Sequence, residues 1–161
     1  STALNYYAQP RLTRDIDITL GVDTDQFFSI EKICQKLKLK ILLPKPEDFV
    51  RKTHVLPAED EKLKIRLDFI FSFTPYEKQA MKRVRKVRVA GYPVKFASPE
   101  DVIIHKVFAG RAIDLEDVKN ILLKQRGKIN VTYIRRWLSK FSELPDQKNI
   151  LKNFNSLMKA I

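Results

Sequence analysis

The residues best placed for chemistry are two aspartates in residues 11–20, "RLTRDIDITL". Apolar and polar residues alternate here, which indicates a β-strand, and Asp15 and Asp17 both fall on its polar side. Side chains two positions apart on a strand share one face and lie roughly 6–7 Å apart. The two like charges therefore repel each other unless a cation compensates them.

A third carboxylate follows on a second predicted strand, residues 62–73, "KLKIRLDFIFSF". Its alternation places Asp68 on the polar side near the middle of the strand. Neighbouring strands lie about 4.8 Å apart, so Asp15, Asp17 and Asp68 converge if the two strands pair.

Three converging carboxylates fit a magnesium or manganese site. Mg²⁺ is usually held by one or two carboxylates together with water and substrate phosphates. Two such ions can activate an attacking hydroxyl and neutralise a leaving phosphate in an in-line displacement. The alternative is that Asp15 and Asp17 form ion pairs with Arg11, Arg14 or Arg66.

The elements that must position these residues predict an α+β fold, with a mixed β-sheet and flanking helices in residues 1–97 and a helical part in residues 98–161. We expect the two parts to pack as one compact unit. In the first part we predict a helix in 2–9, a helix in 23–37, short strands in 39–43 and 53–58, a single helical turn in 46–52, a helix in 75–84 and a hairpin in 86–98. From Ser98 the apolar period becomes helical, and four helices are predicted in 98–110, 114–127, 130–144 and 145–161.

The composition favours a polyanionic partner. The 161 residues include 31 Lys and Arg against 19 Asp and Glu, a net charge of +12. Such an excess attracts nucleic acid or nucleotide phosphates. The charge is densest in residues 76–89, which fit either a phosphate-binding surface or a solvated helix face followed by a charge-protected edge strand.

Other classes are excluded or made less favourable by the same composition. One cysteine and two histidines cannot form an internal disulfide or a Cys/His zinc site. No apolar run approaches the roughly 18–20 residues of a membrane span, and the first residues lack a signal-peptide pattern. We therefore expect a cytoplasmic protein without a membrane partner.

Residues 1–18, "STALNYYAQPRLTRDIDI", resemble the first motif of the polymerase-β-like nucleotidyltransferase superfamily. In that motif a small residue opens a helix and an Asp-x-Asp strand follows, and the small residue lets backbone amides approach a triphosphate. With residues 97–122, "ASPEDVIIHKVFAGRAIDLEDVKNIL", the chain is similar to the AbiEii-type branch of the superfamily.

The resemblance implies roles for individual residues. Asp15 and Asp17 become metal ligands, and Asp68 becomes the third carboxylate and candidate general base. The nucleotide-binding residues are then expected to be Ser1, Thr2, Arg11, Lys106 and Arg111. The alternative for Lys106 and Arg111 is a structural role at a helix end, paired with Asp114 or Asp117.

The function implied is a metal-dependent nucleotidyltransferase that moves a nucleoside monophosphate from an NTP to a hydroxyl acceptor. The resemblance favours RNA, at a tRNA end, as the acceptor, and a role as the toxin of a toxin–antitoxin pair with an antitoxin protein as partner. A small-molecule or protein hydroxyl stays open as the acceptor. The alternative function is a degenerate, non-enzymatic module that binds RNA or protein.

Overall fold

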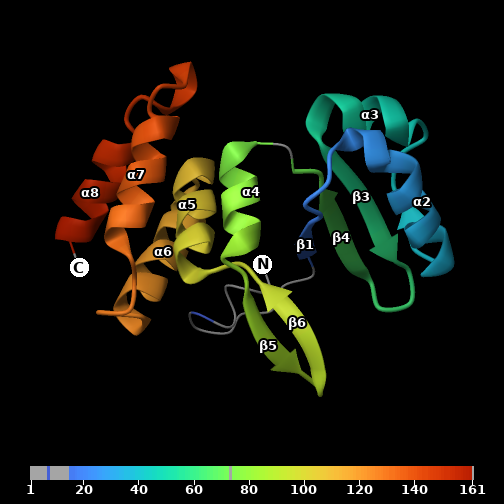
Figure 1. Cartoon of the computed structure of the whole chain (residues 1–161), viewed down its shortest axis with the longest axis horizontal. Coiled ribbons are helices and arrows are strands. Elements are labelled where there is room, and N and C mark those ends of the chain that lie inside the picture. The colour runs from blue at the N-terminus through green and yellow to red at the C-terminus, as the bar shows by residue number, and fades with distance from the viewer. Residues whose placement is uncertain (1–6, 8–14, 73, 161) are drawn as a thin grey trace. The chain divides into compact units, whose positions relative to one another are not determined.

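The computed structural model describes residues 7, 15–72 and 74–160 (Figure 1). Contacts divide these residues into two compact units. The first contains described residues 15–82, and the second contains residues 83–160 together with Tyr7. This division falls earlier in the chain than the boundary predicted after residue 97. The packing of the two predicted parts as one compact unit stays a prediction.

The first unit contains a mixed four-stranded sheet in the order β1–β4–β3–β2. Its strands are β1 (Asp15–Thr19), β2 (Lys40–Ile41), β3 (Val55–Asp60) and β4 (Ile65–Ile70). β1 runs parallel to β4, whereas β3 is antiparallel to both β4 and β2. The predicted strand pairing of β1 with β4 is therefore formed.

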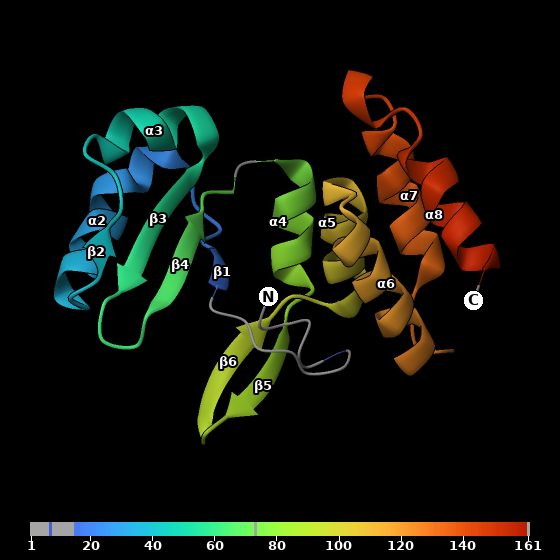
Figure 2. The ribbon, with the colours of Figure 1, turned by 180° about the vertical axis from the view of Figure 1, so that it is seen from behind.

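Helices α2 (Phe27–Lys36) and α3 (Pro46–Thr53) lie beside this sheet (Figures 1 and 2). A 3₁₀ turn, η1 (Thr24–Gln26), precedes α2, and α4 (Pro75–Lys82) completes the unit. The core is formed by apolar side chains from both helices and from one face of the sheet: Phe27, Ile30, Cys34, Val50, Leu56, Ala58, Phe69 and Phe71. The opposite face of the sheet thus carries the polar residues of the alternating pattern.

The single helical turn predicted in 46–52 was too short. α3 has eight residues, with Pro46 at its start and a left-handed His54 at its end. Glu47 and Arg51, one turn apart, form an ion pair of 2.8 Å that supports the second turn.

The second unit contains a hairpin and four helices. The hairpin strands are β5 (Arg85–Val89) and β6 (Tyr92–Phe96). The helices are α5 (Pro99–Ala109), α6 (Ala112–Lys124), α7 (Val131–Phe141) and α8 (Ile150–Lys159), with the 3₁₀ turn η2 (Pro145–Gln147) before α8. The predicted hairpin and helices are confirmed.

The central helix of this unit is α5, which contacts α6, α7 and α8. The Ser98 side chain accepts a hydrogen bond from the Asp101 backbone N–H at the start of α5, and Gly110 ends the helix with φ +67°. Ile103 and Ile104 are fully buried, as are Ile121 of α6 and Leu138 of α7. The α+β fold class is thereby confirmed.

Apart from Tyr7, the predicted helix in 2–9 lies outside the described residues, as do the first residues of the Asp strand. Among the helices that the structure describes, none combines the length and apolar character that a membrane crossing requires.

Candidate active site

The parallel pairing of β1 with β4 places the three predicted carboxylates on one face of the sheet. Asp17 lies directly opposite Asp68, and Asp15 lies opposite Arg66. Paired residues on neighbouring strands point to the same side, so all four side chains share the face away from the core. Asp15 and Asp17 are exposed, and Asp68 is half-buried. The arrangement is a solvent-accessible acidic surface rather than a buried cluster.

A guanidinium lies within this acidic surface. Arg66 Nε donates a hydrogen bond of 2.9 Å to Asp68 Oδ1. This hydrogen bond is the largest of the causes that raise the pKa of Arg66. The negative charge of Asp68 raises this pKa further, and the charges of Asp15 and Asp17 act in the same direction. All three carboxylates therefore act on one cation. The structure thus pairs Arg66 with Asp68, whereas the sequence analysis named Arg66 as an alternative partner of Asp15 and Asp17.

A fourth carboxylate, which the sequence analysis missed, lies on the same face. Glu59 of β3 is opposite Arg66 on the side away from β1. The strand predicted in 53–58 ended one residue before Glu59, and the proximity of Glu59 to Arg66 depends on the register between β3 and β4.

The donor chemistry of this face suits Mg²⁺ or Mn²⁺, which prefer carboxylate oxygens. Within the described part of the chain, however, no three Asp, Glu, His or Cys side chains are gathered closely enough to hold a metal ion. Asp68 is instead directed to Arg66. Shared coordination therefore requires side-chain rotations that bring the three carboxylates closer together, on strands already in register. Metal binding by Asp15, Asp17 and Asp68 stays a prediction.

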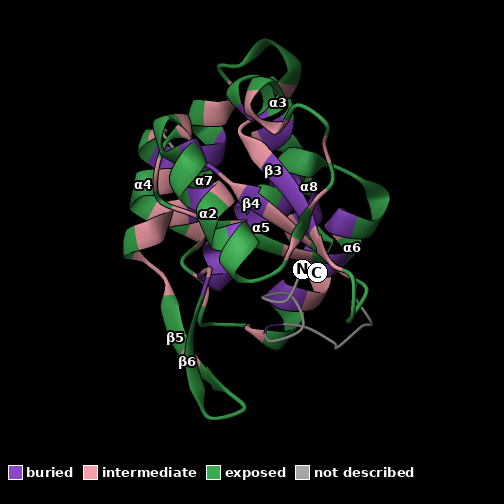
Figure 3. Cartoon of the chain, turned by 90° about the vertical axis from the view of Figure 1, so that its right-hand side faces the viewer, coloured by how far each residue is buried: buried purple, intermediate pink, exposed green. Residues whose placement is uncertain are grey.

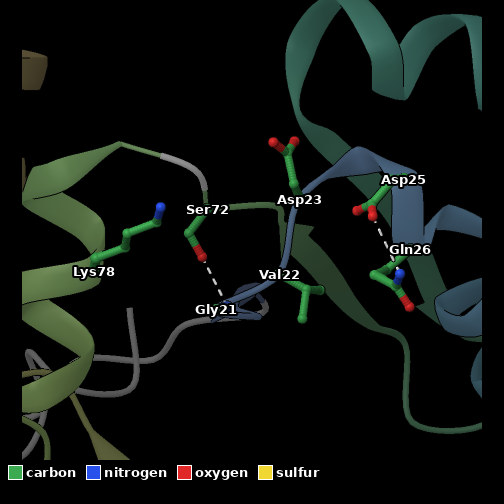
Figure 4. A pocket seen from close by; sticks show the side chains of 7 residues that line it. All are labelled: Gly21, Val22, Asp23, Asp25, Gln26, Ser72 and Lys78. Carbon is green, nitrogen blue, oxygen red and sulfur yellow. Dashed lines mark hydrogen bonds between the residues drawn. The ribbon is translucent and has the colours of Figure 1, made fainter.

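An open depression of about 420 Å³ lies beyond the carboxyl ends of β1 and β4 (Figure 4). Its lining includes Gly21, Asp23, Ser72 and Lys78. The Gly21 N–H donates to Ser72 Oγ at 2.7 Å, and Gly21 has φ +71°, a conformation that favours glycine. None of the three predicted metal ligands lines this depression. The sequence analysis used Gly21 only as the end of the strand and did not identify the depression.

Lys106 lies in a buried ion-pair network within the second unit. Its Nζ donates to Asp114 Oδ1 at 3.0 Å and to Asp117 Oδ2 at 2.6 Å, which joins α5 to α6. Arg111, whose side chain is 75% exposed, also donates to Asp114. The structure thus contains the carboxylate pairing that was the structural alternative for Lys106 and Arg111. Nucleotide contact by Lys106 and Arg111 stays a prediction.

Electrostatics holds the Asp114 carboxylate in its charged form. Burial opposes its ionisation, but hydrogen bonds from Arg111 and Lys106, together with their positive charges, outweigh burial and lower the pKa of Asp114. Both Asp114 and Asp117 are buried. The network consequently depends on Lys106 as its buried cation.

A second, partly buried network was missed by the sequence analysis. Arg83 donates to Glu100 at 3.1 Å and lies 4.0 Å above the Tyr133 ring, while the Tyr133 hydroxyl donates to Asp101 at 2.9 Å. Burial raises the pKa of Tyr133, and the hydrogen bond to Asp101 raises it further. These contacts join residues far apart in the chain, and no periodic pattern indicates them.

Ser1, Thr2 and Arg11, the remaining predicted nucleotide-binding residues, lie outside the described residues. Their roles stay predictions.

Comparison with known proteins identifies the family. The family model described as "Nucleotidyl transferase AbiEii toxin, Type IV TA system" matches residues 1–120, which include the aspartate strands and the Lys106 network. A search of curated proteins found no match. Because the family match covers most of the chain, the protein belongs to the AbiEii family of nucleotidyltransferase toxins of type IV toxin–antitoxin systems.

Proposed function

We propose that the protein is a metal-dependent nucleotidyltransferase that transfers a nucleoside monophosphate from an NTP to a hydroxyl of RNA, at a tRNA end, and releases pyrophosphate. The observation that carries the proposal is the parallel register that sets Asp17 opposite Asp68, with Asp15 on the same face. The family supplies the reaction class and the antitoxin as protein partner. We place the reaction in the cytoplasm, where NTPs and tRNA occur together.

In this proposal Asp15, Asp17 and Asp68 hold Mg²⁺ or Mn²⁺. A divalent ion at such a site neutralises the triphosphate and lowers the pKa of the attacking hydroxyl. Asp68, half-buried and hydrogen-bonded to Arg66, is the candidate to accept the proton of that hydroxyl. Arg66 is half-exposed on the same face, where its positive charge is available to substrate phosphates.

A degenerate binding module is the competing function. A module that only binds a polyanion gains nothing from several carboxylates on one exposed face, because they repel phosphates. The acidic face formed by β1 and β4 therefore favours catalysis.

The test is transfer by the full-length protein. Incubation with each α-³²P-labelled NTP, Mg²⁺ or Mn²⁺, and total tRNA should label the RNA. Asp17→Asn should lower the rate at least about 10³-fold, because losing a shared ligand removes hydroxyl activation and leaving-group stabilisation together. Glu143→Gln, an exposed change in the second unit, is the charge-matched control and should leave the rate unchanged.

Two outcomes would contradict the proposal. If Asp17→Asn and Glu143→Gln label RNA equally, the aspartate face is not the active site. If the parent protein binds RNA but labels neither RNA, protein nor itself with any NTP, the binding module replaces the transferase.

A further inference from the structure

The hairpin β5–β6 forms a sheet of its own in the second unit. Within the described part of the chain its strands pair only with each other, joined at Ala90 and Gly91. Most of its residues are exposed (Figure 3). The hairpin thus presents both of its faces along most of its length.

The strand register divides these two faces by chemistry. Lys86 pairs with Lys95 and Arg88 pairs with Pro93, so one face carries three cations. The other face carries Arg85 opposite Phe96 at the base of the hairpin, followed by the apolar pairs Val87 with Val94 and Val89 with Tyr92. Tyr92, beside the turn, is 75% exposed. The ribbon therefore has a basic face and, beyond Arg85, an apolar face that ends in an exposed aromatic ring.

The positive charge of the hairpin is not balanced locally. Residues 83–96 contain no Asp or Glu. Arg83, just before β5, is paired with Glu100, but Lys86, Arg88 and Lys95 form no ion pair with any carboxylate that the structure describes. A polyanion is the partner that complements such a surface.

Strand addition by a protein fits this hairpin poorly. Pro93 lacks an N–H on β6, and cations along short strands discourage edge pairing. Edge protection alone explains the lysines, but it gives no reason to expose an aromatic ring beside the turn. Single-stranded RNA uses both features, since cations contact its phosphates and its unstacked bases pack on aromatic side chains.

We propose that the β5–β6 hairpin binds single-stranded RNA that passes around its turn, with Lys86, Arg88 and Lys95 of one face on phosphates and an unstacked base on Tyr92 of the other face. The RNA class rests on the acceptor of the proposed function. The binding itself requires neither NTP nor metal.

The test measures the affinity of the full-length protein for a short, fluorescently labelled single-stranded RNA by anisotropy, across a series of salt concentrations and without NTP or metal. The triple variant Lys86→Gln, Arg88→Gln, Lys95→Gln should bind the RNA at least about tenfold more weakly at low salt. The magnitude of its slope of log affinity against log salt should fall by about 2, since each phosphate contact on a single strand contributes about 0.7 to that slope. The control Lys32→Gln, Lys36→Gln, Lys52→Gln removes the same charge from exposed positions on α2 and α3 and should leave both quantities near those of the parent protein.

A second pair of variants tests stacking. Tyr92→Ala should weaken RNA binding at least about fivefold with an unchanged salt slope, whereas Tyr92→Phe should keep the affinity, because stacking requires the ring and not the hydroxyl. Equal melting temperatures, followed by circular dichroism, should show that these surface changes leave the fold intact.

Equal losses of RNA affinity in the hairpin and control triple variants would overturn the inference, because RNA binding would then depend only on the net charge of the protein. A second pair of results would also overturn the inference: no effect of Tyr92→Ala, together with displacement of the RNA by poly-glutamate from the parent protein but not from the hairpin triple variant. These two results would identify the hairpin as a site for an acidic protein. These readouts are independent of transfer. RNA binding through the hairpin without nucleotide transfer would refute the proposed function alone, and transfer to RNA with unaltered binding by the hairpin variants would refute this inference alone.

Discussion

Asp17 of β1 and Asp68 of β4 lie directly opposite each other on parallel strands, and Arg66 lies two residues before Asp68 on the same face. Like charges at opposed positions of a sheet are destabilising. The hydrogen bond from Arg66 to Asp68 offsets part of this repulsion in the protein alone. A divalent cation on the same carboxylates would compete with Arg66, and this competition leads to the first two predictions.

Asp17→Asn should abolish Mn²⁺-dependent binding of a non-hydrolysable NTP, because it removes one carboxylate of the opposed pair. Its free energy of unfolding should be unchanged or higher by up to about 1 kcal/mol, because the repulsion is relieved. Calorimetric titration and urea denaturation measure the two quantities. Equal Mn²⁺ affinity in Asp17→Asn and the Glu143→Gln control would show that the metal binds elsewhere.

Arg66→Gln should tighten the binding of Mn²⁺ alone by about tenfold, since a cation that competes for Asp68 is removed from a site where charge interactions reach about 1–4 kcal/mol. If Arg66 also contacts phosphate, the affinity for the Mn²⁺–NTP complex should rise by less than the affinity for Mn²⁺ alone, or should fall. Mn²⁺ titration followed by electron paramagnetic resonance separates the two effects. Weaker binding of Mn²⁺ alone would show that Arg66 supports the carboxylates instead of competing for them. Arg51→Gln, which breaks the exposed pair with Glu47, is the control and should leave Mn²⁺ binding unchanged.

Lys106→Met should destabilise the protein by about 3–5 kcal/mol, because it leaves Asp114 and Asp117 buried without their shared cation. Arg111→Gln, on an exposed side chain, should cost less than about 1 kcal/mol. Adding Asp114→Asn and Asp117→Asn to Lys106→Met should recover part of the loss. Urea denaturation checks this order. Unchanged stability of Lys106→Met together with lost NTP affinity would favour the nucleotide role.

Stability should fall on acidification partly through Asp114. The pKa of Asp114 is lowered in the folded protein. Its contribution to the free energy of unfolding is therefore present above the pKa of the unfolded chain, near 4, and is lost as the pH falls through the lower pKa of the folded protein. Glu100 also contributes stability that is lost on acidification, because its pKa is lowered in the folded protein. Burial raises this pKa, but hydrogen bonds, first of all the one from the Asn130 N–H, and the charge of Arg83 outweigh the effect of burial. Asp114→Asn should therefore flatten, without abolishing, the decrease in unfolding free energy between about pH 5 and about pH 2. Urea midpoints measure this decrease, and the Glu143→Gln control should keep the steeper curve. An equally steep curve for Asp114→Asn would contradict the assignment.

The sequence by itself determined the local elements. The alternation in 15–19 and 65–70, the Ser98 and Gly110 helix boundaries and the Gly91 hairpin all depend on neighbouring residues, so their pattern is readable along the chain. The family was also readable, because its motifs are short and lie in order within residues 1–120. The length of α3 was underestimated because the prolines before it hid a helix that continues for a second turn.

Only the tertiary structure decided which of these residues meet. A slip of one residue between β1 and β4 would turn Asp17 away from Asp68, and this register is set by burial of the apolar face against α2 and α3 rather than by the aspartates. Lys106 could face solvent at the end of its helix, but the packing of α5 on α6 buries it between Asp114 and Asp117. Such partners are non-local, and their choice follows from the packing of whole elements, which no short stretch of sequence specifies.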